Sequence, residues 1–253
     1  MTTTSPVTAI APLRHEEAMR LQAEELDRTV TELRMLGTRD WDLATDCPDW
    51  DVRAMYQHVL GACEAGASMR ENVHQMRLAR GKRRRHGGPL EAALSSVQVA
   101  ERATLSGPQV VARLAAVAPR TVRGRGRIPS LARKHARLRV DGPVFETWVL
   151  GYLVDVIYLR DLWMHRVDLH VAVGRPLEVS ADHDGRIVAD VVAEWARRHD
   201  RAFVLELTGP AGGTYAGVGA SDPALLSMDA VEFCRTLAGR SPGTGLLATV
   251  VPF

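Results

Sequence analysis

The chain has 253 residues, 46% of them hydrophobic and 25% charged, so it can bury a sizeable core as one large domain or two ordinary ones. Its formal net charge of +2 argues against a protein whose main role is to coat nucleic acid. Three widely separated cysteines without a CxxC pair argue against a disulfide framework and a cysteine zinc site. We expect a cytoplasmic protein without a membrane partner, because the sequence has neither a signal pattern nor an apolar run of about 20 residues.

A loose lead-in rich in Thr and Pro precedes the first predicted helix, which runs from Leu13 to about Gly37. A connection broken by Pro48 follows. Asp51 can cap a second helix, which extends toward Arg80. His58 lies on the apolar side of this second helix. A lone histidine in such a place is more often a satisfied core residue than a ligand, so its role depends on what faces it.

Two arginine-rich stretches follow. Residues 81–88 and 120–139 are predicted as solvated loops, with a helical segment over residues 90–118 that breaks at 106–108. The second stretch could instead form an anion-attracting rim over a site. Nucleic-acid contact is the weakest alternative, because no aromatic residues are interleaved with the charges.

The fourth predicted helix spans residues 144–173 and carries ionisable residues along its apolar side. Asp161 and His165 are four residues apart, so they lie one turn apart on one face and can reach a single point. Tyr158 and Asp168 continue this face. Buried ionisable groups need a cation, a mutual hydrogen bond or a wet cavity, and a structural Asp–His hydrogen bond is as good an interpretation of this segment alone. With His58 from a second helix, three N/O ligands would suit a catalytic divalent ion.

Four long amphipathic segments predict an up-and-down four-helix bundle over residues 13–175. After Gly174-Arg-Pro176 the sequence pattern changes from long helices to short helices and strands. It predicts a helix around residues 187–195, strands at 202–207 and 214–218, a helix from Asp229 to Leu237 and a final strand at 245–251. Residues 177–253 therefore read as a small α+β domain. The predicted fold class is mainly α plus a small α+β domain.

Three motifs, in this order, resemble the mycothiol-dependent maleylpyruvate isomerase family within the larger group of DinB-like metal-binding bundles. They are Pro48-Asp-Trp-Asp-Val-Arg-Ala-Met-Tyr-Gln-His58, then Asp161-Leu-Trp-Met-His165-Arg-Val-Asp168, and finally the segment from Asp229 to Arg240. The resemblance implies a DinB-like bundle, a divalent ion, most often zinc, on His58, Asp161 and His165, and mycothiol as the thiol co-substrate.

The chain departs from the family pattern at Asp161, where the family usually has Glu. Aspartate is one methylene shorter, which bears on metal affinity more than on the fold. Arg240 or Arg235 could correspond to a C-terminal arginine that the family uses near its active site, or form a surface salt bridge. Arginine suits a carboxylate because its planar fork donates two parallel hydrogen bonds.

The resulting hypothesis is an enzyme that holds the mycothiol sulfur as thiolate for attack on a small-molecule electrophile, by S-transfer or by cis/trans isomerisation of an activated double bond. Tyr158, Asp168 and Arg240 are the further candidate catalytic residues; Asp168 would accept the second N–H of a metal-bound histidine, or else pair with an arginine such as Arg166. The alternative is a non-catalytic DinB-like protein that binds a ligand or metal. We expect a monomer or homodimer without a nucleic-acid partner, and surface positions for His15, His74, His86, His135, His170, His183 and His199.

Overall fold

The computed structural model describes residues 4–141, 145–219 and 222–253. The chain divides into two compact units. One contains residues 14–175, and the other contains residues 1–13 together with 176–253. Each is described by itself below, and the domain limits 13–175 and 177–253 stay a prediction. None of the helices in the described ranges is both long and apolar enough to cross a membrane.

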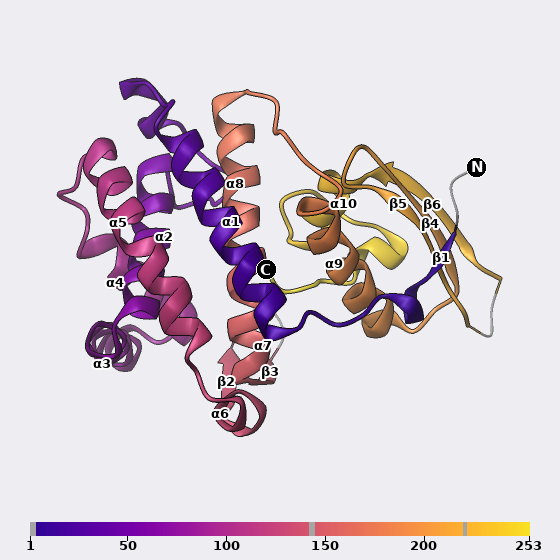
Figure 1. The fold of residues 1–253 in the computed structure, drawn as a ribbon, viewed down its shortest axis with the longest axis horizontal. Coiled ribbons are helices and arrows are strands. Elements are labelled where there is room, and N and C mark those ends of the chain that lie inside the picture. Colours follow the sequence, from indigo (N-terminus) through magenta and orange to yellow (C-terminus); the bar gives the residue numbers. More distant parts are fainter. Residues whose placement is uncertain (1–3, 142–144, 220–221) are drawn as a thin grey trace. The chain divides into compact units, whose positions relative to one another are not determined.

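Four helices form the core of the larger unit: α1 (His15–Leu33), α2 (Val52–Ala67), α5 (Gly107–Gly126) and α8 (Tyr158–Val173). Helix α1 contacts α5 and α8, and α2 contacts the same two helices, which closes a four-helix bundle (Figure 1). Buried Leu26, Tyr56, Leu60, Leu114 and Leu162 belong to its hydrophobic core. Burying such side chains contributes roughly 1.5–3 kcal/mol each, so the bundle can hold polar groups rigidly. The predicted fold class, mainly α with a smaller α+β part, is confirmed.

A second pair of helices lies between α2 and α5 in sequence and corrects the prediction of one long helix to Arg80. The chain breaks at Ser68, whose backbone is extended and whose Oγ caps α3 (Met69–His86). Helix α4 (Leu90–Ala100) packs against α2 and α3. The arginine-rich residues 81–86 therefore lie in a helix and not in a loop. Arginine is a good helix former, and basic side chains suit the negative end of the helix dipole.

The second arginine-rich stretch is also largely ordered. Helix α5 continues through Pro119 to Gly126, and α6 (Ser130–His135) and β2 (Arg137–Asp141) follow. Strand β2 pairs in antiparallel fashion with β3 (Phe145–Val149). The fourth helix was predicted from residue 144, which lies outside the described residues, and its start is corrected because Phe, Thr, Trp and Val favour the strand. A short turn, α7 (Leu150–Tyr152), and a π-helical turn, η3 (Leu153–Ile157), lead into α8. Such π turns recur next to functional sites.

The smaller unit contains a four-stranded sheet of order β1-β5-β4-β6. Strands β4 (Phe203–Thr208) and β5 (Gly213–Gly217) form the predicted hairpin, and β6 (Ala224–Asp229) adds to β4 in parallel. The N-terminal lead-in contributes β1 (Ser5–Pro6) and a short 3-10 helix, η1 (Val7–Ala9). Helices α9 (Asp184–His199) and α10 (Ala230–Leu237) contact each other, and Asp229 caps α10 as predicted.

Two details of the sequence interpretation are wrong here. Strand β6 was not foreseen, and the last segment forms a 3-10 helix, η4 (Gly245–Ala248), where a strand was expected. A short apolar run does not by itself distinguish a strand from a helical turn. Gly245 adopts a positive φ of 58°, which turns the chain, and the carbonyl of Leu246 accepts a hydrogen bond from Trp195 Nε1 at 2.9 Å. A further 3-10 helix, η2 (Thr38–Asp42), follows α1.

Candidate metal centre

Helices α2 and α8 bring His58, Asp161 and His165 together. The spacing in the sequence predicts only that Asp161 and His165 lie close to each other. One ligand atom from each residue lies within 4.8 Å of the others. Oδ1 of Asp161 lies 3.3 Å from Nε2 of His165 and 3.8 Å from Nε2 of His58. His165 is buried, while the Asp161 side chain is 26% exposed. The carboxylate therefore stands between two imidazole rings at the edge of the core.

The electrostatics of this cluster favour charge on both partners. Burial opposes ionisation of Asp161, but His165 and His58 outweigh it and hold the pKa of the carboxyl well below its usual range. Burial likewise opposes protonation of His165, and Asp161 outweighs it with help from Asp168, so that the pKa of His165 is raised well above its usual value. Without a metal, the site therefore binds a proton on His165 in the place that a cation would take.

The second nitrogen of His165 faces another buried group. Oδ2 of Asp168 lies 3.4 Å from Nδ1 of His165, and the Asp168 side chain is fully buried. The thiol of Cys47 donates to the same Oδ2 at 3.6 Å and lies 4.0 Å from Nδ1 of His165. A carboxylate in this position fixes the tautomer and ring orientation of a metal-ligating histidine. Asp168 and Cys47 therefore both lie beside Nδ1 of His165, and the predicted role of Asp168 stays a prediction.

The indole ring of Trp50 packs beside the imidazole rings of His58 and His165. Its ring stacks on His58 with centroids 4.9 Å apart and planes inclined by 29°, and its centroid lies 6.2 Å from that of His165. The rings of His58 and His165 meet edge to face at 5.4 Å. The connection that carries Trp50 and Cys47 is held by Thr45, whose hydroxyl donates to the Trp50 carbonyl at 2.8 Å. This loop therefore fixes one side of the cluster.

Tyr158 lies one turn before Asp161 and is covered by a buried cation. The guanidinium carbon of Arg125 is 4.0 Å from the centre of the Tyr158 ring. Arg125 is only 2% exposed and donates to Oε1 of Gln22 at 2.8 Å. Burial raises the pKa of the Tyr158 hydroxyl, Arg125 partly offsets this increase, and Asp161 adds to it. Tyr158 is therefore a neutral phenol near neutral pH, capable of donating a hydrogen bond.

The donor set fits a divalent ion such as zinc. Ligands at about 2.0–2.1 Å in a tetrahedron lie roughly 3.4 Å apart, close to the 3.3 and 3.8 Å that separate Asp161 Oδ1 from the imidazole nitrogens. The distance to His58 exceeds a hydrogen bond, and Nδ1 of His58 is buried without a hydrogen-bond partner in the described part of the chain. Oδ1 of Asp161 therefore lies between the Nε2 atoms of both histidines, although aspartate is one methylene shorter than glutamate.

The candidate arginines and the remaining histidines lie outside this cluster. Arg240 follows α10 in the smaller unit, so its part in this centre stays a prediction, and Arg235 donates to Glu232 at 2.9 Å. The expectation that the remaining histidines lie at the surface is wrong for His183, which is 1% exposed. Several others have acidic neighbours: His15 lies 2.6 Å from Asp155, His74 lies 2.7 Å from Glu101, and His170 lies 3.0 Å from Glu32.

Cys47 and Trp50 were missed as neighbours of the centre. Both belong to the short motif that precedes α2, but only the folded chain places Cys47 beside His165, 118 residues away in sequence. Their position next to the helix that carries His58 was the one signal available from the sequence.

Comparison with known proteins shows the family and the fold of this chain. Residues 19–170 match the family described as the mycothiol maleylpyruvate isomerase N-terminal domain. Two solved structures share the fold: the mycothiol-dependent maleylpyruvate isomerase and a variant of it in which one histidine is replaced by alanine. Each is 16% identical to this chain, covers 94% of it and 93% of its own length, and superposes with a TM-score of 0.59. No curated protein gives a significant match. The chain belongs to the mycothiol maleylpyruvate isomerase N-terminal domain family, a family of enzymes.

Proposed function

We propose that this protein is a metal-dependent and mycothiol-dependent enzyme, with zinc as the favoured ion, that uses the thiol as a thiolate nucleophile. The observation that carries the proposal is the position of Asp161 Oδ1 between the Nε2 atoms of His165 and His58, at 3.3 and 3.8 Å. His58, Asp161 and His165 would hold the ion, whose positive charge when bound keeps the thiol sulfur deprotonated near neutral pH.

The chain's own residues would then have distinct tasks. Asp168 accepts from Nδ1–H of His165 and keeps Nε2 directed at Asp161, and the Cys47 thiol supports Asp168. The Tyr158 hydroxyl is protonated near neutral pH, as a phenol ordinarily is, and burial raises its pKa further. It would donate a hydrogen bond to an oxygen of the electrophile on which negative charge develops. Arg240 would bind a carboxylate of the substrate.

The proposed reaction begins with attack of the thiolate on an electrophilic carbon, which forms a carbon–sulfur bond. In S-transfer a leaving group departs with the bonding electron pair. In isomerisation, addition to an activated double bond permits rotation, and loss of the same thiolate restores the double bond in the other geometry. We favour S-transfer, because the family is broad and we expect true maleylpyruvate isomerases to be a small part of it. The two outcomes differ in whether the thiol leaves again.

The first test is metal content, measured by elemental analysis on the wild type beside His58→Ala, Asp161→Ala and the matched control His74→Ala. The control histidine is half-exposed and pairs with Glu101, away from the centre. We expect about one divalent ion per chain in the wild type and in the control, and none in the two site variants. Equal metal in all four proteins would contradict the ligand assignment.

The second test separates the enzyme from a non-catalytic DinB-like ligand- or metal-binding protein. The alternative is favoured by Asp161 itself, where the family usually has Glu. Mycothiol consumption would be followed with a chromogenic aryl halide and with a cis-configured activated alkene. Turnover that is lost in Tyr158→Phe while metal content is kept supports the enzyme. A metal-loaded protein that consumes no thiol with either substrate supports the binding protein.

A further inference from the structure

The positive charge of the chain is strongly segregated. Residues 77–86 and 130–140 contain ten of the 32 Lys and Arg side chains and none of the 30 Asp and Glu side chains. The rest of the chain is therefore net acidic, although the whole carries a formal charge of only +2. Neither segment supplies a residue of the metal centre. Such concentration of one sign creates a local field that the net charge conceals.

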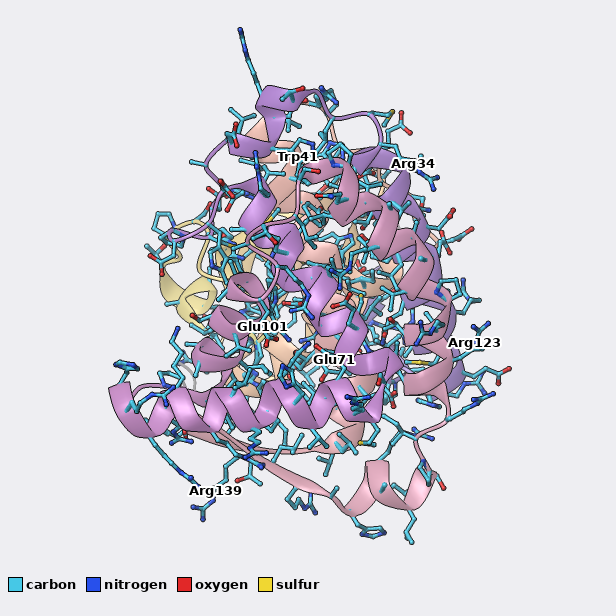
Figure 2. The ribbon with its side chains drawn as sticks, turned by 90° about the vertical axis from the view of Figure 1, so that its left-hand side faces the viewer. Arg34, Trp41, Glu71, Glu101, Arg123 and Arg139 are labelled. Carbon is cyan, nitrogen blue, oxygen red and sulfur yellow. The ribbon has the colours of Figure 1, made fainter. Side chains whose placement is uncertain are left out.

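The fold places the two segments next to each other. Arg83 near the end of α3 forms an ion pair with Asp141 at the end of β2. Phe145 is the cross-strand partner of Asp141, and their side chains share one face of the hairpin, as does Arg139 two residues earlier. In Figure 2, α3 crosses the lower part of the view and Arg139 extends beneath it. We call this surface, formed by residues 77–86, 130–140 and Phe145, the basic face.

Most cations of the basic face point to solvent. Arg77, Arg80 and Arg84 are exposed and recur at steps of three and four residues, so they line one side of α3, with exposed Arg85 adjoining. Arg137 and Arg139 alternate on β2 and are also exposed. In the part of the chain that the structure describes, Arg83 and Arg133 pair with Asp141 and Asp155, whereas the exposed arginines named above form no ion pair with a carboxylate. Solvated arginines of this kind are suited to bind an extended anionic surface.

Large apolar side chains stand among these cations. Phe145 is 83% exposed, Leu131 on α6 is 71% exposed, and Leu78 on α3 is 41% exposed. Isolated exposed apolar residues are ordinary, but three within a strongly basic surface are the pattern of peripheral membrane contacts, in which arginines meet lipid phosphates and apolar side chains enter the interface. A nucleic-acid groove would favour stacked aromatic residues, and the basic face has only Phe145.

We propose that the basic face binds the surface of an anionic phospholipid membrane. This proposal departs from the expectation of no membrane partner, which rested on the lack of a signal pattern and of a spanning segment. A peripheral contact needs no spanning helix, and none is found among the described helices. Each Lys or Arg close to an anionic membrane strengthens binding about fivefold, and apolar insertion adds to this without dependence on salt. Four exposed arginines together therefore contribute on the order of several hundredfold, which is enough to decide between bound and free protein.

The test is sedimentation of the full-length protein with phosphatidylcholine vesicles that contain or lack phosphatidylglycerol, at low and high salt. The test variant replaces Arg77, Arg80, Arg84 and Arg85 by Gln. The matched control makes the same charge change at exposed arginines elsewhere in the chain: Arg34, Arg39, Arg197 and Arg201. A Phe145→Ser variant tests the apolar contribution. For each protein, binding to duplex DNA and the metal content of the protein are measured in parallel.

We expect the wild type and the control to sediment only with the phosphatidylglycerol vesicles and to be released by high salt, while the test variant stays in solution. Phe145→Ser should bind severalfold more weakly with an unchanged salt dependence. Wild type that stays in solution with the anionic vesicles, equal loss in test and control variants, or binding to DNA alone would overturn the proposal. None of the substituted residues belongs to the metal centre, so the metal content should be the same in all variants. A failure of membrane binding can therefore be told apart from a failure of the proposed metal site.

Discussion

Oδ2 of Asp168 lies 3.4 Å from Nδ1 of His165, while Oδ1 of Asp161 lies 3.3 Å from Nε2 of the same ring. The imidazole is therefore held between two carboxylates, one at the proposed metal position and one inside the core. Asp168 is fully buried and also accepts the Cys47 thiol hydrogen at 3.6 Å. In the proposed metal centre, Asp168 and Cys47 would be positioning residues that act through His165.

We predict that Asp168→Asn weakens zinc binding 10–100-fold, because the amide no longer provides the negative charge that orients and polarises His165. Zinc affinity is measured by competition with a chromophoric chelator. Cys47→Ser keeps a donor to Asp168 and should change affinity only severalfold. An affinity in Asp168→Asn equal to that of the wild type would show that His165 is oriented without this carboxylate.

The protonation of His165 also determines how the stability of the metal-free protein depends on pH. The pKa of His165 is raised in the folded, metal-free protein, so its protonation stabilises the fold fully below the unfolded value of about 6.5, and this contribution is lost as pH rises through the folded pKa. The depressed pKa of Asp161 contributes stability above about pH 3.9, which is lost as pH falls through the folded pKa. The metal-free protein should therefore lose stability as pH increases above about 6.5.

Urea unfolding of chelator-treated protein over a pH series measures this effect. Asp161→Asn removes the largest cause of the raised His165 pKa, and the decline above pH 6.5 should become shallower in this variant. Zinc must displace the His165 proton, so its affinity for the wild type should rise over the same pH range. Parallel pH profiles for the wild type and Asp161→Asn would contradict the coupling between the two side chains.

Helical spacing explains why the proximity of Asp161 and His165 could be predicted from the sequence. Asp161 and His165 are one turn apart in any α-helix, and Asp51, whose side chain accepts from the Ala54 amide at 2.7 Å, fixes where the helix that carries His58 begins. Contacts distant in sequence were not accessible in this way. Nothing local indicates that Cys47 meets His165, because that contact depends on how the loop folds onto α8.

The errors in the fold have equally local causes. The break after α2 depends on a single residue, Ser68, whose capping hydrogen bond to the Glu71 amide redirects the chain between two segments that are both helical in character. The β2–β3 hairpin was missed because Arg137 and Arg139 were interpreted as part of a charged loop, although they alternate with Leu138 and Val140 as strand residues do. The charged side chains obscured the alternation of polar and apolar residues that is typical of a strand.

Trp50 should influence the metal centre through His58. Its ring stacks on the imidazole at 4.9 Å, and such pairs contribute about 0.5–1.5 kcal/mol beyond the area that they bury. We predict that Trp50→Ala lowers zinc affinity severalfold while Trp50→Phe stays close to the wild type. Isothermal titration with zinc measures both. A loss in Trp50→Phe as large as in Trp50→Ala would point to the indole N–H and not to the stacked ring.

A buried ion pair joins α8 to α1 near the centre. Arg166 Nε donates to Glu25 Oε1 at 2.6 Å and its Nη2 donates to Glu25 Oε2 at 3.3 Å, with both side chains fully buried. Glu25→Ala removes the fully buried partner and leaves Arg166 with Glu32, whose Oε1 lies 3.4 Å from Arg166 Nη1. The free energy of unfolding should therefore fall by at most about 3–5 kcal/mol, the cost of an unpaired buried charge. Replacing both, with Glu25→Leu and Arg166→Met, should restore much of that loss, because apolar side chains need no desolvated counter-charge. Urea unfolding of the single and double variants measures the coupling. Additive losses would mean that Glu25 and Arg166 stabilise the bundle separately, and that packing and the contacts of Glu32 with α8 align the two helices.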